Sequence, residues 1–278
     1  MDSIKKSKAN VIVNHLLAIF WTLVCLFPIA FSFMNSFKNN TQIFMAPFAL
    51  PETLSFANYA FAIERAQIFR GMMNSFIYAG TATLLTILIV LPVAYALTRM
   101  RLPFSNLIMM FFVAGLTLPI HATLISLSVI VRDLGMRNTY PGIIIVYVAT
   151  SLSFSVFVLS NFIKGISPEM DEAATIDGCG IVRIIFQIIM PLAKPAIVTC
   201  AIITFLRVYN DLIFSVVLLT RESMMTVSIA LMRFRGDLVT DYGGMFAGII
   251  LTIIPLVLFY IFMQKKIEQG LTEGAVKG

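Results

Sequence analysis

The chain carries a polar stretch that reads Glu-Met-Asp-Glu-Ala-Ala-Thr-Ile-Asp-Gly at residues 169–178, then nine further residues, then Ile-Ile-Met-Pro at residues 188–191. This stretch separates two long apolar runs. Charged residues make up only 12% of the chain, yet Glu169, Asp171, Glu172, Asp177 and Arg183 gather here. The pattern predicts a polar loop between two membrane-spanning segments, at one surface of the membrane.

The composition indicates a membrane protein. The 278 residues are 59% hydrophobic, with a mean hydropathy of +0.93, whereas soluble domains are about 25% charged. The net charge of +6 does not indicate nucleic-acid binding, because Lys and Arg lie at the ends of apolar runs, where they mark membrane boundaries. Cys25, Cys179 and Cys200 are scattered without a CxxC pair, so neither a disulfide framework nor a metal site is expected.

Six apolar runs are long enough to cross a membrane, since a helix needs roughly 20 apolar residues to span about 30 Å of hydrocarbon. Irregular backbone is costly in lipid, so each run is expected to be a helix. The fold class is therefore all-α, a polytopic membrane protein with six transmembrane helices. The runs lie at about 11–34, 74–98, 104–131, 141–163, 195–219 and 245–263, and four of them contain an internal proline, namely Pro28, Pro92, Pro119 and Pro255.

The first span sets the expected orientation. Lys5, Lys6 and Lys8 precede it and only Lys38 follows it closely, which predicts cytosolic N- and C-termini for six spans. We divide the chain into an N-terminal span with an extracytoplasmic loop (1–70), a transmembrane core (71–264) with a cytosolic loop at about 164–194, and a cytosolic C-terminal tail (265–278).

The loop at 164–194, between spans four and five, is expected to be a helix-turn-helix. Ser167 suits an N-cap and Pro168 the first helical position. The acidic residues of the first turn favour the positive end of the helix dipole. Gly178 fits a left-handed C-terminal stop. A second segment runs from Ile181 to Met190, and Pro191 is expected to end it.

Such a hairpin could present its first helix to a partner below the membrane. Ala173 and Ala174 keep the surface small, and Glu172 could anchor an arginine. The alternative is a solvated amphipathic loop whose acidic residues serve only the helix dipole and solubility.

The spacing of the loop resembles a known family. Glu172-Ala173-Ala174, three residues, Gly178, nine residues, Ile188, one residue and Met190-Pro191 are similar to the "EAA" coupling loop of ABC importer permeases, which usually have Leu at the position of Met190. Shorter motifs resemble the carbohydrate (maltose-type) branch of that family: Ser36-Phe37-Lys38, Asn58-Tyr59, Asn74-Ser75-Phe76, the run from Ala94 to Arg99, Tyr209-Asn210-Asp211, and the run from Gly270 to Gly278.

The resemblance implies a permease subunit of a sugar or oligosaccharide importer in a prokaryotic cell membrane. Its implied partners are a second permease subunit, two ATPase subunits and an extracytoplasmic solute-binding protein. The chain has no G-x-x-x-x-G-K-[ST] motif. We therefore expect no enzyme and no bound cofactor or metal here, with ATP and Mg²⁺ held by the ATPase subunits. The implied coupling residues are Glu172, Ala173, Ala174, Asp177, Gly178 and Pro191.

Two charges lie inside the fifth apolar run. Arg207 and Asp211 are four residues apart, so they can meet on one helix face, and charges in the membrane are costly without a partner or cavity. One interpretation is a self-neutralising ion pair. The other is a polar patch that lines the substrate path together with Asn210 and Tyr209, where the family usually has Trp.

Other classes are less consistent with the sequence. A membrane enzyme lacks support, because neither H-E-x-x-H nor G-x-S-x-G occurs. A secondary transporter or channel with six helices is the remaining alternative, although it would not need an acidic Glu-Ala-Ala hairpin.

Overall fold

The computed structural model describes residues 8–100, 102–236 and 240–275. Its regular structure is helical, and an isolated β-bridge joins Arg235 to Thr240, so the all-α prediction is confirmed. The chain divides into two compact units, Met1–Ile68 with Leu231–Leu256, and Phe69–Ala230 with Val257–Gly278. Lys5, Lys6 and the last three residues, 276–278, lie outside the described residues.

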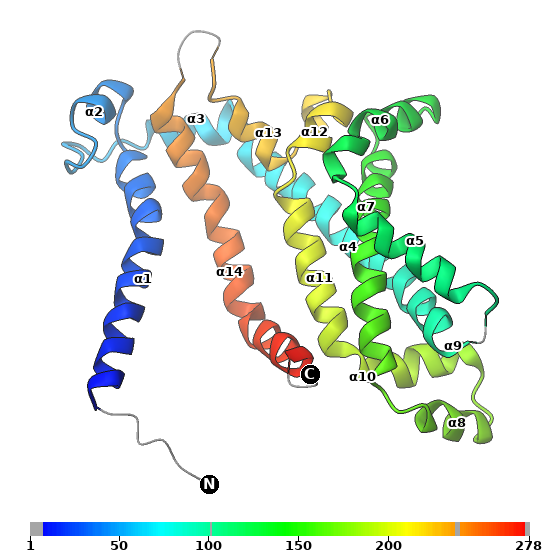
Figure 1. Ribbon diagram of the computed structural model, residues 1–278. Coiled ribbons are helices and arrows are strands. Elements are labelled where there is room, and N and C mark those ends of the chain that lie inside the picture. The colour runs from blue at the N-terminus through cyan, green and yellow to red at the C-terminus, as the bar shows by residue number, and fades with distance from the viewer. Residues whose placement is uncertain (1–7, 101, 237–239, 276–278) are drawn as a thin grey trace. The chain divides into compact units, whose positions relative to one another are not determined.

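The first unit contains α1 (Lys8–Asn35), α2 (Asn40–Met45), α3 (Ala57–Glu64) and the start of α14 (Tyr242–Ala275) (Figure 1). In α1, only 6% of the most apolar window is buried. A helix this apolar and this exposed is suited to contact with lipid or another membrane chain rather than water. Pro28 and Pro255 lie inside α1 and α14, as expected.

Two of the short sequence motifs meet beyond the end of α1. Asn58 donates from its side-chain amide to the carbonyl oxygens of Ser36 (2.7 Å) and Lys38 (2.9 Å), and the hydroxyls of Ser36 and Tyr59 are 2.7 Å apart. The Lys38 ammonium is buried and donates to the carbonyl of Ala46 at 3.1 Å. Burial lowers the pKa of Lys38. Local side-chain bonds thus fix the segment that follows the first span.

The second unit is arranged around α7 (Tyr140–Lys164), which packs against α5 (Ser105–Thr117) and α11 (Lys194–Tyr209). In α7, 56% of the most apolar window is buried, against 33% in α4 (Ile68–Arg99). The unit also contains η1 (Ile120–Thr123), α6 (Leu124–Asp133), α8 (Glu169–Ile176), α9 (Ile181–Arg183), η2 (Ile184–Ile189), α10 (Met190–Leu192), α12 (Ile213–Leu218), η3 (Glu222–Met224) and most of α13 (Val227–Met232).

Three described helices are long and apolar enough to cross a membrane alone: Val11–Asn35, Ile68–Arg99 and Tyr140–Lys164. Ile181–Leu192 and Lys194–Tyr209 pass the same test together but are bent by 82°. Ser105–Thr117 and Tyr242–Leu258 are shorter apolar helices. The count of six spans stays a prediction.

The apolar run at 104–131 is not one helix, contrary to expectation. α5 ends at Thr117, and Leu118 is extended (φ −72°, ψ 127°) before Pro119. The proline ring disfavours a helical conformation for the residue before it, and proline donates no N–H. These two effects turn the expected kink into a break between α5 and α6.

The run at 195–219 is also interrupted, at residues 210–212 between α11 and α12. Asp211 supplies the local reason, because its Oδ2 accepts the backbone N–H of Ser215 at 3.0 Å. This bond satisfies one of the amides that a new helix leaves without an intrahelical acceptor. The polar residues that mark this run as unusual therefore also divide it into two helices.

The start of α7 depends on a close backbone approach. An added Cβ at Gly142 would collide with the carbonyl of Met136, whereas one at Gly80 in α4 would meet nothing within 4 Å. We expect Gly142→Ala to destabilise the protein by about 1–3 kcal/mol through overpacking. Gly80→Ala should be neutral or stabilising by up to about 1 kcal/mol. Thermal midpoints of the purified protein in detergent test this, and equal midpoints for the two variants would contradict the packing described here.

Candidate functional site

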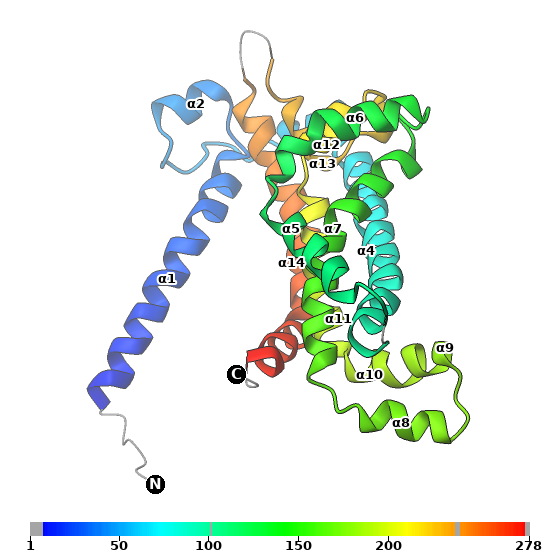
Figure 2. The same cartoon turned by 45° about the vertical axis from the view of Figure 1, so that its right-hand side comes forward.

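Residues 169–192 form a hairpin at one end of the second unit. α8 leads into a turn, and the helical segment α9–η2–α10 returns beside it (Figure 2). The middle of the return segment, Ile184–Ile189, is π-helical. The helix-turn-helix that the sequence predicts at 164–194 is present in this form.

The turn of the hairpin is a Schellman motif. Gly178 has φ +79°, its N–H donates to the carbonyl of Thr175 (3.0 Å), and the N–H of Cys179 donates to that of Ala174 (2.9 Å). These two bonds satisfy carbonyl groups that the end of α8 would leave unpaired. The left-handed stop predicted at Gly178 is confirmed.

The ends of the hairpin differ slightly from expectation. α8 begins at Glu169, one residue after the predicted start, and the N–H of Glu169 lies 3.4 Å from the Ser167 hydroxyl. Pro191 does not end the second segment, which continues to Leu192 before an 82° bend into α11. Pro191 follows a π-helical stretch, so its missing N–H falls where the bonding pattern changes from π to α.

The predicted coupling residues divide between two faces. Glu172, Ala173, Asp177, Gly178 and Pro191 are exposed, whereas Ala174 is buried in an apolar cluster with residues of α4, α7 and α11. Ile176, at the end of α8, is 86% exposed. The sequence analysis did not single out Ile176, although an apolar residue just before a turn glycine is a usable signal. The exposed face of α8 thus combines carboxylates, a small residue and one apolar side chain.

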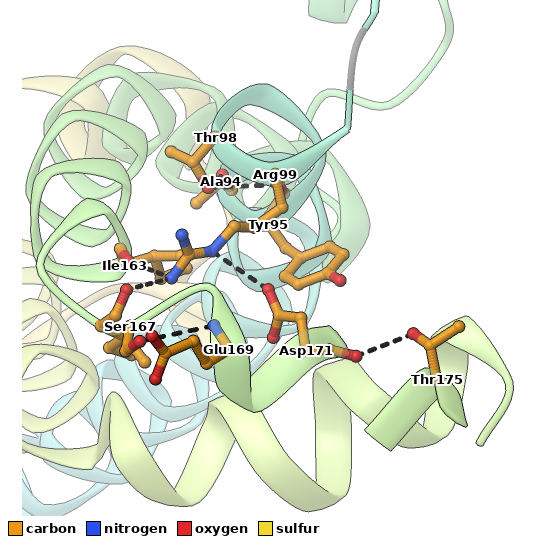
Figure 3. Close-up of polar contacts among 10 residues, drawn as sticks. Ala94, Tyr95, Thr98, Arg99, Ile163, Ser167, Glu169, Asp171 and Thr175 are labelled. Atoms are coloured by element: carbon orange, nitrogen blue, oxygen red, sulfur yellow. Dashed lines mark hydrogen bonds and ion pairs between the residues drawn. The ribbon is translucent and has the colours of Figure 1, made fainter. Parts of the chain in front are cut away.

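The inner face of α8 is held by an ion pair (Figure 3). Nε of Arg99, the last residue of α4, lies 3.1 Å from Oδ2 of Asp171, and the two side chains are only 11% and 14% exposed. Nη2 of Arg99 also donates to the carbonyl of Ile163, at 3.0 Å, and to that of Ile166. One guanidinium therefore joins the ends of α4 and α7 to the first turn of α8.

Charge attraction rather than hydrogen bonding holds Asp171. Neither of its carboxylate oxygens accepts a hydrogen bond from the described residues. Burial raises the pKa of the Asp171 carboxyl, the Arg99 guanidinium opposes that rise, and Glu172 adds to it. Arg99 is thus the group that compensates for burying this carboxylate.

The sequence analysis missed this ion pair, because it assigned Asp171 to the helix dipole. A signal was available, since Arg99 ends one apolar run and Asp171 lies in the loop after another. Both were expected at the same membrane surface.

A second polar site lies in the wall of a cavity of about 250 Å³. The residues that line it come from η1, α7, α11, α12 and the break before α12. They are Ile120, Tyr147, Thr150, Arg207, Val208, Asp211 and Phe214. Arg207 and Asp211, predicted as pathway residues, are both among them.

Arg207 is bound to α7. Its Nη1 donates to the carbonyl of Thr150 at 3.1 Å, and its Nη2 contacts the carbonyl of Tyr147 and the hydroxyls of Thr150 and Ser151. Charge-assisted bonds of this kind offset part of the cost of placing an arginine among apolar helices.

Asp211 uses one of its two oxygens for structure. Oδ2 accepts from the Tyr147 hydroxyl (2.9 Å), the Ser215 N–H (3.0 Å) and the Ser215 hydroxyl (3.1 Å). Oδ1 accepts no hydrogen bond from the described residues. The described residues show no direct ion pair between Asp211 and Arg207, because each side chain is bound to other groups instead.

The other two predicted pathway residues do not line the cavity. Tyr209 is 1% exposed, and its ring packs against those of Phe76 (5.0 Å) and Phe205 (6.0 Å between centroids). Asn210 is exposed, and its side chain donates to the carbonyl of Leu206 at 2.9 Å.

Two cavity residues, Tyr147 and Thr150, were missed by the sequence analysis. With Ser151 they occur at i, i+3 and i+4 within an apolar run, which places their hydroxyls on one helix face. That spacing was a usable signal for a polar face on span four.

Residues 88–273 match the family described as the inner membrane component of binding-protein-dependent transport systems. The chain belongs to this family. The matched range contains both the hairpin and the cavity, and the resemblance to importer permeases is confirmed.

Relatives match over nearly the whole chain. The diacetylchitobiose uptake system permease protein NgcG of Streptomyces coelicolor is 33% identical over 95% of this chain and 88% of its own length. The trehalose/maltose transport system permease protein MalG of Thermococcus litoralis is 30% identical, with coverages of 94% and 95%.

The crystal structure of a bacterial ABC transporter that imports alginate contains a chain with the same fold. Its TM-score is 0.81 at 23% identity, and the match covers 95% of this chain and 99% of that chain. At this identity the likeness shows the fold alone.

Gly178 and Gly180 offer a matched test of this family member's turn. Both would have open space around an added Cβ, but only Gly178 has positive φ, since Gly180 has φ −72°. Gly178→Ala should cost about 1–2 kcal/mol of local stability, so the amide of Cys179 should exchange with deuterium roughly tenfold faster. Gly180→Ala should leave that rate near the parent's. Equal exchange rates in the two variants would show that the turn does not require a left-handed residue.

Proposed function

We propose that this chain forms one half of the translocation pathway of an ATP-driven importer for a sugar or oligosaccharide. An extracytoplasmic solute-binding protein delivers the solute, a second permease subunit completes the pathway, and two ATPase subunits supply the energy. The family match across residues 88–273 carries this proposal, because it includes both the exposed hairpin and the polar cavity.

The sugar class is supported by the relatives. One is named for diacetylchitobiose, one for trehalose and maltose, and one, from Bacillus subtilis, for melibiose, raffinose and stachyose. The alginate importer has also been solved with a periplasmic protein bound to an alginate pentasaccharide, at a TM-score of 0.62 and 18% identity.

The proposed topology is six spans in a prokaryotic cell membrane with both termini in the cytosol. The broken runs at 104–131 and 195–219 count as the third and fifth spans. The hairpin between spans four and five then faces the cytosol, on the side where ATP is available. α14 continues through the residues assigned to the C-terminal tail, as far as Ala275.

The exposed face of α8 is the proposed docking surface for an ATPase subunit. Glu172 and Asp177 offer carboxylates to basic side chains, and Ala173 and Gly178 allow close approach. Ala174 packs inward, and Pro191 lies at the end of the return segment. ATP and Mg²⁺ are bound by the partner, and this chain needs no cofactor of its own.

The cavity is the proposed contact site for the solute. Oδ1 of Asp211 can accept from a sugar hydroxyl, and Arg207 retains N–H groups that no described residue accepts. Tyr147 and Phe214 contribute aromatic side chains to the same wall. The volume of about 250 Å³ is just below the roughly 300–1,000 Å³ of ligand pockets. The cavity of this subunit would therefore hold only a small part of an oligosaccharide.

Glu172→Lys tests the docking surface. If Glu172 meets a basic residue of the ATPase subunit, the substitution places like charges together. Breaking a buried pair costs about 3–5 kcal/mol, so even a partly exposed pair should weaken association at least tenfold, which is about 1.4 kcal/mol. Pulldown of the ATPase subunit from detergent-solubilised complexes measures this. Glu52→Lys, at an exposed residue of the first unit, makes the same charge change and should bind as the parent does. Parent-level binding by Glu172→Lys would remove Glu172 from the interface.

Asp211→Asn tests the solute site and the importer function together. The amide oxygen can retain the bonds that Oδ2 accepts, while an amide nitrogen, which can only donate, replaces Oδ1. Losing a hydrogen bond to a charged group costs about 1.5–3 kcal/mol, so the KM for maltodextrin or chitobiose uptake into proteoliposomes should rise at least tenfold. Asp133→Asn, on an exposed side chain of α6, is the matched control. Uptake that needs neither ATP nor a binding protein would refute the importer function. An unchanged KM for Asp211→Asn would refute only the site.

A further inference from the structure

The hairpin is linked to two of its neighbours through the chain itself. Residues 165–168 connect α7 to α8, and the bend at Ala193 connects α10 to α11. A displacement of the hairpin therefore reaches α7 and α11 through short covalent connections. α4 has no such connection, because its last residue, Arg99, is 70 positions before Glu169.

Among the described residues, α4 meets the hairpin through an ion pair and an apolar cluster. The polar contact is the Arg99–Asp171 ion pair, and the cluster brings Ala94 and Tyr95 together with Ala174 and Ile185. The attraction between apolar side chains is non-directional, so the cluster by itself does not fix one orientation of α4 against the hairpin. The guanidinium is different, because its planar fork holds Asp171 and the carbonyls of Ile163 and Ile166 at once, a geometry that a lysine ammonium does not reproduce.

The other end of α4 is fastened to the segment at 223–227. The side-chain amide of Asn74 donates to the carbonyls of Ser223 (3.0 Å) and Met225 (2.9 Å). The hydroxyl of Tyr78 donates to the carbonyl of Met224 at 2.9 Å. The N–H of Val227 donates to the hydroxyl of Ser75, also at 3.0 Å. Asn74, Ser75 and Tyr78 are all buried.

α4 therefore has polar attachments at both ends. Asn74 and Arg99 are 25 residues apart in one helix, or about 37 Å at 1.5 Å per residue. The helix continues through Pro92 without interruption. Figures 1 and 2 both show the hairpin at one end of α4. Near the other end they show the start of α13, whose first residue, Val227, is the last of segment 223–227.

We propose that Arg99 is the positioning residue that makes α4 follow the hairpin, and that α4 in turn moves segment 223–227 at the opposite end of the unit. This inference rests on the proposed importer function, in which ATPase subunits displace the hairpin. The nucleotide state on one side of the membrane would then alter a backbone segment on the other side. No residue of segment 223–227 needs to contact an ATPase subunit for this to occur.

A single thiol on the segment can report this movement. Ser223 is exposed, so Ser223→Cys is introduced into a chain in which Cys25, Cys179 and Cys200 are replaced. The assembled complex is purified through a tag on this chain and reconstituted. The reaction rate with a membrane-impermeant maleimide is then measured without nucleotide and with MgATP plus orthovanadate. Because allosteric coupling is typically 5–150-fold, we expect the rate in the parent background to change at least about fivefold.

Arg99→Lys should reduce that change to less than about twofold while the ATPase subunits remain bound and still hydrolyse ATP. The substitution keeps the positive charge of residue 99 but removes the planar guanidinium that bonds to several oxygen atoms at once. Arg132→Lys is the matched control, because Arg132 pairs with Asp133 on an exposed surface, with side chains 62% and 60% exposed, and it should respond as the parent does. Asn74→Ala removes the hydrogen bonds from the other end of α4 to segment 223–227 and should also reduce the nucleotide-dependent change in rate.

Three results would overturn the proposal. The first is a parent-level response in Arg99→Lys. The second is loss of the ATPase subunits from that variant, which would show that Arg99 shapes the hairpin itself. The third is a parent complex that shows neither ATP hydrolysis nor a nucleotide response. That third result would also refute the importer function, whereas the first two would leave it intact.

Discussion

α7 is held by arginine side chains that come from two different helices. Arg207 of α11 donates to carbonyls of the first half of α7, and Arg99 of α4 donates to one carbonyl at the end of α7 and one just after it. In surroundings with little water, a guanidinium that has no hydrogen-bond acceptor is costly, and so is a carbonyl that has no donor. The need of Arg99 and Arg207 for oxygen acceptors therefore helps to fix α4 and α11 against α7. Each of these contacts also lies beside one of the two candidate sites.

Local rules made the hairpin predictable. Gly178 follows the end of one helix and lies three residues before the next segment, and glycine adopts the left-handed conformation of such a stop without strain. Long apolar runs likewise predicted long helices. The interruptions were harder to foresee. Pro119 predicted a kink, but the helix breaks there, because Leu118 adopts the extended conformation that a following proline favours without enforcing it.

The candidate sites show where sequence reasoning reaches its limit. Arg207 and Asp211 stood out as charges in an apolar run. Their spacing of four residues predicted that both would lie on one face of a helix. Tyr209 is two residues from Arg207, about 200° around a helix of 3.6 residues per turn, which agrees with its burial against Phe76. The partners could not be deduced, because Tyr147 and Thr150 belong to another helix. For the Arg99–Asp171 pair the sequence offered only a shared membrane surface, since the contact itself depends on how three helix ends meet.

The two oxygens of Asp211 have separate tasks. Oδ2 is committed to Tyr147 and to the start of α12, while Oδ1 accepts no hydrogen bond from the described residues of a side chain that lines the cavity. In the proposed solute site, architecture and recognition would thus be divided between two atoms of one side chain. Evolution could change the chemistry of the cavity wall around Oδ1 while Oδ2 continued to hold α12 in place. A division of this kind is one way for a single helical scaffold to diversify toward the different carbohydrates after which its relatives are named.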